Sequence, residues 1–132
     1  MHSITRSITL ALAALVLCLA PSAALAGDDD DDRNEQRVAG SCTGGTTAKL
    51  KVKYDDGRIE TEFEVDQNRT GVTWKVRVRR NGKLVIRTRA TTAGRSGSFS
   101  VERKIGNPAG TDQIRARATS PSGEVCRASA SI

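Results

Sequence analysis

The most constraining feature of this sequence is an alternation of apolar and polar residues that begins at Thr47 and continues to the C-terminus. The alternation has a period of two, and turn-forming residues interrupt it about every eight to twelve residues. Because successive side chains of a strand point to opposite faces, such a pattern predicts strands with one buried face. No segment has a helical period of useful length. We therefore predict an all-β fold, a single seven-stranded antiparallel sandwich.

The first predicted hairpin joins a lysine-rich strand to a glutamate-rich strand. Residues 48–54 alternate apolar residues with lysines, and residues 59–65 alternate apolar residues with glutamates. A two-residue type I′ turn at Asp56-Gly57 would place each lysine directly opposite a glutamate. The predicted pairs are Lys53–Glu60, Lys51–Glu62 and Lys49–Glu64, with Leu50 opposite Phe63 on the other face. Such charge pairs each contribute about 0.2–1 kcal/mol, so we interpret the pattern as structural.

The second predicted hairpin spans residues 72–88 and turns at Asn81-Gly82. A two-residue turn would pair Val76 with Arg87 and so mix the buried and exposed faces. A three-residue loop, with Gly82 in the left-handed conformation, keeps the faces separate, and the burial pattern favours it. The predicted pairs are then Val78–Leu84 and Val76–Ile86.

Three more strands are predicted at residues 99–105, 114–118 and 126–132. Cys126 falls on the inward face of the last strand, and Cys42 lies just before the first. The first and last strands of a sandwich lie close together, so a disulfide can join these two residues. Chain-entropy models assign such a long loop about 4–5 kcal/mol of stabilisation.

The N-terminal segment, residues 1–26, has the three parts of a cleavable secretory signal peptide. Arg6 supplies positive charge, residues 8–19 are apolar, and the small residues Ala24 and Ala26 flank Leu25. We predict cleavage between Ala26 and Gly27 and hence a secreted, extracellular protein. The apolar stretch is shorter than the roughly 20 residues that a membrane-spanning helix needs, so we expect no membrane association after cleavage.

Cys18 lies within this signal peptide and suggests an alternative, a lipid-modified N-terminus. Such a site has a small residue before the cysteine, whereas Leu17 is bulky. We therefore interpret Cys18 as an apolar residue that is removed with the peptide. An even pair of cysteines in an exported chain then predicts the Cys42–Cys126 disulfide.

Charge separates a short leader from the rest of the chain. Gly27–Arg37 contains six acidic and two basic residues, whereas the chain from Val38 onward contains 18 basic and 9 acidic residues. The leader has few apolar residues, so we predict that residues 27–39 are disordered and that the folded domain covers residues 40–132. The run Asp28–Asp32 could bind calcium weakly, fold back over a basic surface, or act as a solvated spacer, which we favour.

Composition excludes several kinds of catalysis. The single histidine, His2, lies in the signal peptide, so the exported chain has no imidazole for a nucleophile pair or a zinc site. Paired carboxylates leave glycoside hydrolysis as an alternative. The aromatic residues that would line a sugar cleft fall at core positions; they are Tyr54, Phe63, Trp74 and Phe99. We predict a protein that is not an enzyme and that has no metal or cofactor.

Two segments resemble immunoglobulin-like and fibronectin-type bacterial modules. WKVRVRRNGK at residues 74–83 resembles their third strand and following turn. GTDQIRARAT at residues 110–119, followed by Ser122-Gly123 and Cys126, resembles their closing hairpin. The whole chain resembles small secreted proteins of unknown function from high-GC bacteria, which share an export signal, an acidic start and one disulfide. The resemblance covers residues 40–132 and implies the fold but no activity. Unlike true immunoglobulin domains, the chain lacks an inter-sheet disulfide against the tryptophan.

The resulting sheet order concentrates positive charge on one outer face. If the Trp74 strand lies between the Ile114 and Leu84 strands, eight basic residues share that face. They are Lys75, Arg77, Arg79, Arg87, Arg89, Arg115, Arg117 and Arg127. The face is interpreted either as a binding site for an extracellular polyanion or as a solvated surface that favours solubility. Cell-wall polymers, acidic exopolysaccharides, extracellular DNA and acidic proteins are the candidate partners. Sequence-specific nucleic-acid recognition is not expected, because no exposed aromatic residue is available to stack bases.

The leading functional hypothesis is therefore a secreted, non-catalytic domain that binds anionic extracellular or cell-envelope polymers through this face. The alternative is a protein-interaction module of the inhibitor or adhesin type, which would act through loops or an open strand edge. A small carboxylate hydrolase is the third hypothesis.

Overall fold

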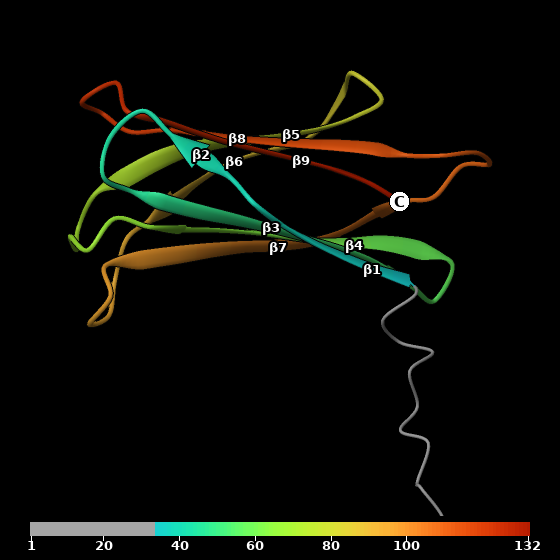
Figure 1. Ribbon diagram of the computed structural model, residues 1–132, viewed down its shortest axis with the longest axis horizontal. Coiled ribbons are helices and arrows are strands. Elements are labelled where there is room, and N and C mark those ends of the chain that lie inside the picture. Colours follow the sequence, from blue (N-terminus) through green and yellow to red (C-terminus); the bar gives the residue numbers. More distant parts are fainter. Residues whose placement is uncertain (1–33) are drawn as a thin grey trace, which may run out of the picture.

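The alternation of apolar and polar residues produces two antiparallel sheets that pack face to face (Figure 1). The computed structural model describes residues 34–132, so the predicted signal peptide, its cleavage site and the run Asp28–Asp32 lie outside the described residues. Within residues 34–132, no helix is long and apolar enough to cross a membrane.

Within the described residues, nine strands make up the two sheets. Sheet A has the order β1-β3-β4-β7, with β1 at Glu35–Ala39, β3 at Thr47–Asp55, β4 at Arg58–Asp66 and β7 at Ser98–Gly106. Sheet B has the order β2-β9-β8-β5-β6, with β2 at Ser41–Cys42, β9 at Val125–Ser131, β8 at Gln113–Thr119, β5 at Thr73–Arg80 and β6 at Lys83–Thr91. The seven predicted strands correspond to β3–β9. The expected position of the Trp74 strand, between the Ile114 and Leu84 strands, is confirmed.

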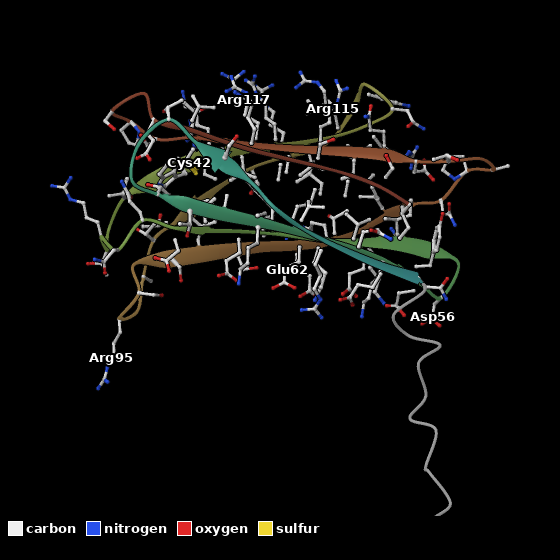
Figure 2. All side chains as sticks on the ribbon, viewed as in Figure 1. Cys42, Asp56, Glu62, Arg95, Arg115 and Arg117 are labelled. Atoms are coloured by element: carbon white, nitrogen blue, oxygen red, sulfur yellow. A yellow bond between two sulfur atoms is a disulfide. The ribbon has the colours of Figure 1, made fainter. Side chains whose placement is uncertain are left out.

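The inward side chains of both sheets form one core. Trp74 is fully buried at its centre, and its ring packs against Phe99 with the ring centroids 6.2 Å apart. The indole N–H of Trp74 donates to Oε1 of Gln67 at 3.2 Å. Tyr54 was predicted to be a core residue, and this prediction is wrong, because its exposed fraction is 36%. Figure 2 shows Asp56 at the end of the sandwich, and Tyr54 precedes it by two residues near the end of β3.

The first hairpin, β3–β4, has the predicted register. Asp56 and Gly57 have φ angles of 49° and 71°, and both values are positive as a type I′ turn requires. All the predicted pairs are present, including Leu50 opposite Phe63 in the core. The three predicted lysine–glutamate pairs are also ion pairs: Lys53–Glu60, Lys51–Glu62 and Lys49–Glu64.

The second hairpin, β5–β6, corrects our prediction of a three-residue loop. Arg80 pairs with Lys83 across a two-residue turn, in which Asn81 and Gly82 have φ angles of 48° and 83°. A bulge in β6 then leaves Val85 without a partner. The observed pairs are Arg79–Leu84, Val78–Ile86 and Val76–Thr88. The bulge separates the faces as the longer loop was expected to do, because one extra residue restores the alternation. It also leaves Leu84 outside, with an exposed fraction of 40%.

The N-terminal part of the sandwich corrects the predicted domain boundary and the number of strands. Residues 35–39, expected to be a disordered leader, form β1, which pairs with β3 and places Val38 opposite Leu50. The chain then crosses from sheet A to sheet B at Gly40 and forms β2 (Figure 1). A Cβ atom on Gly40 would lie 2.6 Å from the carbonyl oxygen of Arg127, so only glycine fits without a shift.

The predicted disulfide between Cys42 and Cys126 is confirmed. It joins β2 to β9, where the two cysteines lie directly opposite each other. Cys126 is fully buried, as predicted for the inward face of the last strand.

Candidate anion-binding face

The outer surface of sheet B is formed by the outward side chains of β5, β6, β8 and β9. All eight basic residues predicted to share a face lie there, and all are exposed. We call this set the arginine face: Lys75, Arg77, Arg79, Arg87, Arg89, Arg115, Arg117 and Arg127. Figure 2 shows the side chains of Arg115 and Arg117 pointing away from the sandwich.

The register of sheet B aligns four of these arginines in one row. Arg77 on β5 lies opposite both Arg87 on β6 and Arg117 on β8, and Arg117 lies opposite Arg127 on β9. Neighbouring strands are about 4.8 Å apart, so the backbone positions of the row span about 14 Å. We call these four residues the arginine row. Sequence reasoning identified its members but not their alignment.

Two shorter rows flank the arginine row. Arg79 lies opposite Arg115 on one side, and Lys75 lies opposite Arg89 on the other. Because side chains on one face of a strand recur every second residue, the rows are about 7 Å apart. Eight cations thus occupy a compact patch that four strands support.

The arginine face has no carboxylate of its own. Between Thr73 and Ser131, none of the outward residues of β5, β6, β8 and β9 is aspartate or glutamate. In the described part of the chain, none of the eight basic side chains forms an ion pair. Most of the other outward residues carry a hydroxyl or amide group, including Thr91, Gln113 and Ser129. The positive charge of this face is therefore uncompensated within residues 34–132.

Two shallow hollows lie on the face, and Arg77 lines both. The larger has a volume of about 630 Å³ and is bounded by the β1–β2 crossover at residues 39–41. Its charged lining is Arg77, Arg79, Arg115, Arg117 and Arg127, and hydroxyl groups come from Ser41 and Ser129. The smaller, of about 340 Å³, is lined by residues that include Lys75, Arg77, Arg87 and Arg89. Both hollows present several donors to one volume, which suits a multivalent anion.

The outer surface of sheet A has the opposite character. Lys51 Nζ lies 2.5 Å from Glu62 Oε2, and Lys104 Nζ lies 2.5 Å from Asp55 Oδ2. The hydrogen bond with Glu62 raises the pKa of Lys51, and the same bond lowers the pKa of Glu62. The hydrogen bond with Lys104 likewise lowers the pKa of Asp55. These ion pairs compensate the charges of their members, although the register of sheet A also places Arg37 opposite Lys51 and Glu62 opposite Glu102.

A buried aspartate helps to position the strands of the arginine face. Asp112, with an exposed fraction of 1%, lies 3.7 Å from Arg80 Nε and accepts a hydrogen bond from Asn81 Nδ2 at 3.3 Å. Asn81 Oδ1 in turn accepts from the backbone N–H of Gln113 at 2.8 Å. These bonds connect the β5–β6 turn to the start of β8. The sequence analysis did not identify this cluster, because its members are distant along the chain.

Among residues 34–132, no three histidine, cysteine, aspartate or glutamate side chains gather closely enough to hold a metal ion. Comparison with known proteins gives no match for this chain, either to a protein-family model or to a curated protein.

Proposed function

We propose that this protein is a secreted, non-catalytic domain that binds a polyanion on its arginine face. The observation that carries the proposal is the arginine row, in which Arg77 and Arg117 lie opposite each other and opposite further arginines. Like charges directly opposite in a sheet are destabilising. A bound anion would remove this cost, since it supplies the negative charge that the face lacks.

The choice of residue supports a binding role over a solubilising one. Seven of the eight residues of the arginine face are arginine. The cross-strand ion pairs of β3 and β4 use lysine instead, as at Lys49, Lys51 and Lys53. A solvated surface needs only charge, which lysine supplies equally well. The guanidinium group adds a planar fork that binds phosphate or carboxylate through two hydrogen bonds.

Location outside the cell is part of the proposal. Residues 1–26 have the pattern of a secretory signal peptide, with cleavage proposed between Ala26 and Gly27. The Cys42–Cys126 disulfide is compatible with this location, because disulfides persist in oxidising compartments.

The proposed absence of catalysis rests on composition. Residues 27–132 contain no histidine, and the two cysteines in this segment are joined to each other. Imidazole general-base chemistry and thiolate chemistry therefore lack their side chains.

We also propose an immunoglobulin-like relationship, as the resemblance of residues 74–83 and 110–119 implied. If β3–β9 are labelled A to G, strands A, B and E lie in one sheet and G, F and C in the other. Immunoglobulin sandwiches separate these strands in the same way. Here the fourth strand, β6, lies beside C instead of beside E, as the added C′ strand of variable-type domains does. On this labelling, the arginine face is the outer face of the G-F-C sheet.

The test measures retention of the exported chain, residues 27–132, on immobilised polyphosphate, polygalacturonate and double-stranded DNA at increasing NaCl. Retention on at least one polymer should weaken as salt rises, because binding releases condensed counterions and added salt reduces the free energy gained from that release. Arg77→Glu with Arg117→Glu should abolish it. Arg69→Glu with Arg95→Glu is the matched control, since both residues are exposed, lie in connections between strands and give the same change in net charge. Equal loss in both double variants would contradict the proposal, as would salt-insensitive retention.

An open strand edge favours the alternative function, a protein-interaction module. β6 is nine residues long and forms one edge of sheet B, so its outer backbone groups have no strand partner in residues 34–132. An extended segment of another protein could add to such an edge by backbone hydrogen bonds. In that case Arg115→Glu with Arg127→Glu, which lie on β8 and β9 away from this edge, should leave partner capture intact. Loss of capture in this variant would count against the alternative.

A further inference from the structure

The chemistry of the arginine face narrows the class of polyanion. Guanidinium groups bind phosphate through two parallel hydrogen bonds, and hydroxyl groups are also common donors to phosphate oxygens. The larger hollow combines five arginines with the hydroxyl groups of Ser41 and Ser129. This donor set contains no acceptor carboxylate that would repel a phosphate.

The absence of aromatic side chains on this face narrows the class further. In the described part of the chain, Phe63, Trp74 and Phe99 are buried, and Tyr54 lies on β3 in the other sheet. Single-stranded nucleic acids are commonly held by bases that stack on exposed aromatic rings. A duplex keeps its bases stacked inside and presents its phosphates outside, so cations and hydroxyl groups are sufficient to bind it.

The density of charge on the face also matches a duplex. The arginine row spans about 14 Å, and the three rows together span a similar length along the strands. Double-stranded DNA carries one negative charge per about 1.7 Å of its helix axis, which gives about eight charges over about 14 Å. About half of these would face the protein, which matches the four arginines of the row. A polymer with fewer charges per unit length would leave arginines uncompensated.

We propose that the arginine face binds the phosphate backbone of double-stranded DNA without reading its base sequence. This inference rests on the proposed function and names its ligand. The four arginines of the row would lie against consecutive phosphates and supply four phosphate contacts. The flat face contacts the backbone and not the groove edges, where sequence is read.

The experiment measures the affinity of the exported chain for two labelled 20-base-pair duplexes of unrelated sequence by fluorescence anisotropy. Each phosphate contact contributes about −0.9 to the slope of log K against log salt concentration. Four contacts predict a slope of about −3.6, or about a 100-fold loss of affinity between 50 and 200 mM NaCl. The two duplexes should bind equally well.

Matched variants identify the face that is responsible. Arg77→Gln with Arg117→Gln should lower affinity and bring the slope to about −1.8, since two phosphate contacts are lost. Arg69→Gln with Arg95→Gln should leave both quantities unchanged. Thermal midpoints measured for all variants show that each is folded. An unchanged slope in the first variant, or equal changes in both, would overturn the inference.

Two further polymers separate the failure of this inference from the failure of the proposed function. Polyphosphate and polygalacturonate are measured as competitors of the duplex and as direct ligands. If polygalacturonate alone binds and Arg77→Gln with Arg117→Gln abolishes that binding, the DNA inference is wrong and the polyanion proposal is supported. If none of the three polymers binds, both are wrong. Polyphosphate binding without duplex binding also contradicts the inference, because it shows phosphate recognition without a fit to the duplex.

Discussion

The two outer faces of this sandwich use charge in opposite ways. On sheet A, Glu60 lies between Lys53 and Lys104 on the neighbouring strands. On sheet B, Arg117 lies between Arg77 and Arg127. Both rows are antiparallel with a cation on each flanking strand, and the central residue is a buried glutamate in one and an exposed arginine in the other. Cross-strand pairs of opposite charge stabilise a sheet, and pairs of like charge destabilise it by similar amounts. Sheet A therefore pairs opposite charges at most of its cross-strand positions, although Arg37–Lys51 and Glu62–Glu102 are like-charge pairs. The eight basic residues of sheet B form no ion pair within residues 34–132.

This difference implies that sheet B is held together by other contacts. Its inward positions on β8 and β9 are mainly alanines, which belong to the same buried core as Trp74. The Cys42–Cys126 disulfide joins β2 to β9 at one edge, and the Asp112 cluster holds the ends of β5 and β8. The comparison can be tested by removing the support of each sheet in turn.

The largest effect is expected from the disulfide, which belongs to sheet B. Cys42→Ala with Cys126→Ala removes a link between residues 84 positions apart. Chain-entropy models predict a loss of about 4–5 kcal/mol in the free energy of unfolding. Urea unfolding of the oxidised protein and of this variant measures the difference. A loss below about 1 kcal/mol would show that sheet B does not depend on its covalent link.

The next effect tests sheet A by giving it the charge pattern of sheet B. Glu60→Lys would create a row of three lysines, with residue 60 between Lys53 and Lys104. Two favourable pairs become unfavourable, so the free energy of unfolding should fall by about 1–2 kcal/mol. Glu60→Gln is the control, and it should show about half of this loss because it removes attraction without adding repulsion. Urea unfolding at low ionic strength measures both variants, and equal stability of the two would contradict the like-charge argument.

The converse change gives sheet B the pattern of sheet A. Arg117→Glu would place a carboxylate between Arg77 and Arg127. The free energy of unfolding should rise by about 0.5–1 kcal/mol, since two like-charge pairs become opposite pairs. Retention on polyanions should fall at the same time. A variant that is more stable but binds less would show that the arginine row is kept at a cost to stability. A fall in both quantities would instead point to disruption of the sheet.

The sequence predicted some of these features because they are local. The β3–β4 pairs follow from one two-residue turn and the alternation on either side of it, so Lys53 and Glu60 could be matched without a structure. Membership of the arginine face follows from the period of each strand together with the assumed order of the strands in the sheet. The alignment of Arg77 with Arg117 could not be predicted, because it depends on the register between strands that are far apart in the sequence.

The sequence analysis did not predict three other features, because the local pattern of residues does not determine them. The bulge at Val85 and the two-residue turn together preserve the faces, and the pattern alone fits a longer loop equally well. β1 has Val38 as an inward apolar residue among charged neighbours, so its alternation is too weak to indicate a strand. Asp112 reads as an ordinary loop residue, because its partner Arg80 lies at the end of β5, far away in the sequence.

The smallest effect is a dependence of stability on pH that arises in sheet A. The pKa of Glu62 is lowered by its hydrogen bond with Lys51, and that of Asp55 by its hydrogen bond with Lys104. A carboxyl whose pKa is lower in the folded state stabilises the protein above its unfolded pKa of about 4, and this contribution is lost as the pH falls through the folded pKa. The pair of Lys51 and Glu62 is partly exposed, so its loss should cost less than about 1 kcal/mol.

The same measurement at alkaline pH, made on one variant from each sheet, completes this test. The pKa of Lys51 is raised, so its contribution is present below about pH 10.4 and is lost as the pH rises through the folded value. Glu62→Gln should therefore flatten the dependence of the urea midpoint on pH, both below about pH 5 and above about pH 10. Arg117→Gln should leave that dependence unchanged, because arginine stays charged throughout and pairs with no carboxylate here. If Arg117→Gln flattened the curve as much as Glu62→Gln, the arginine face would be coupled to a carboxylate, and the contrast between the two sheets would fail.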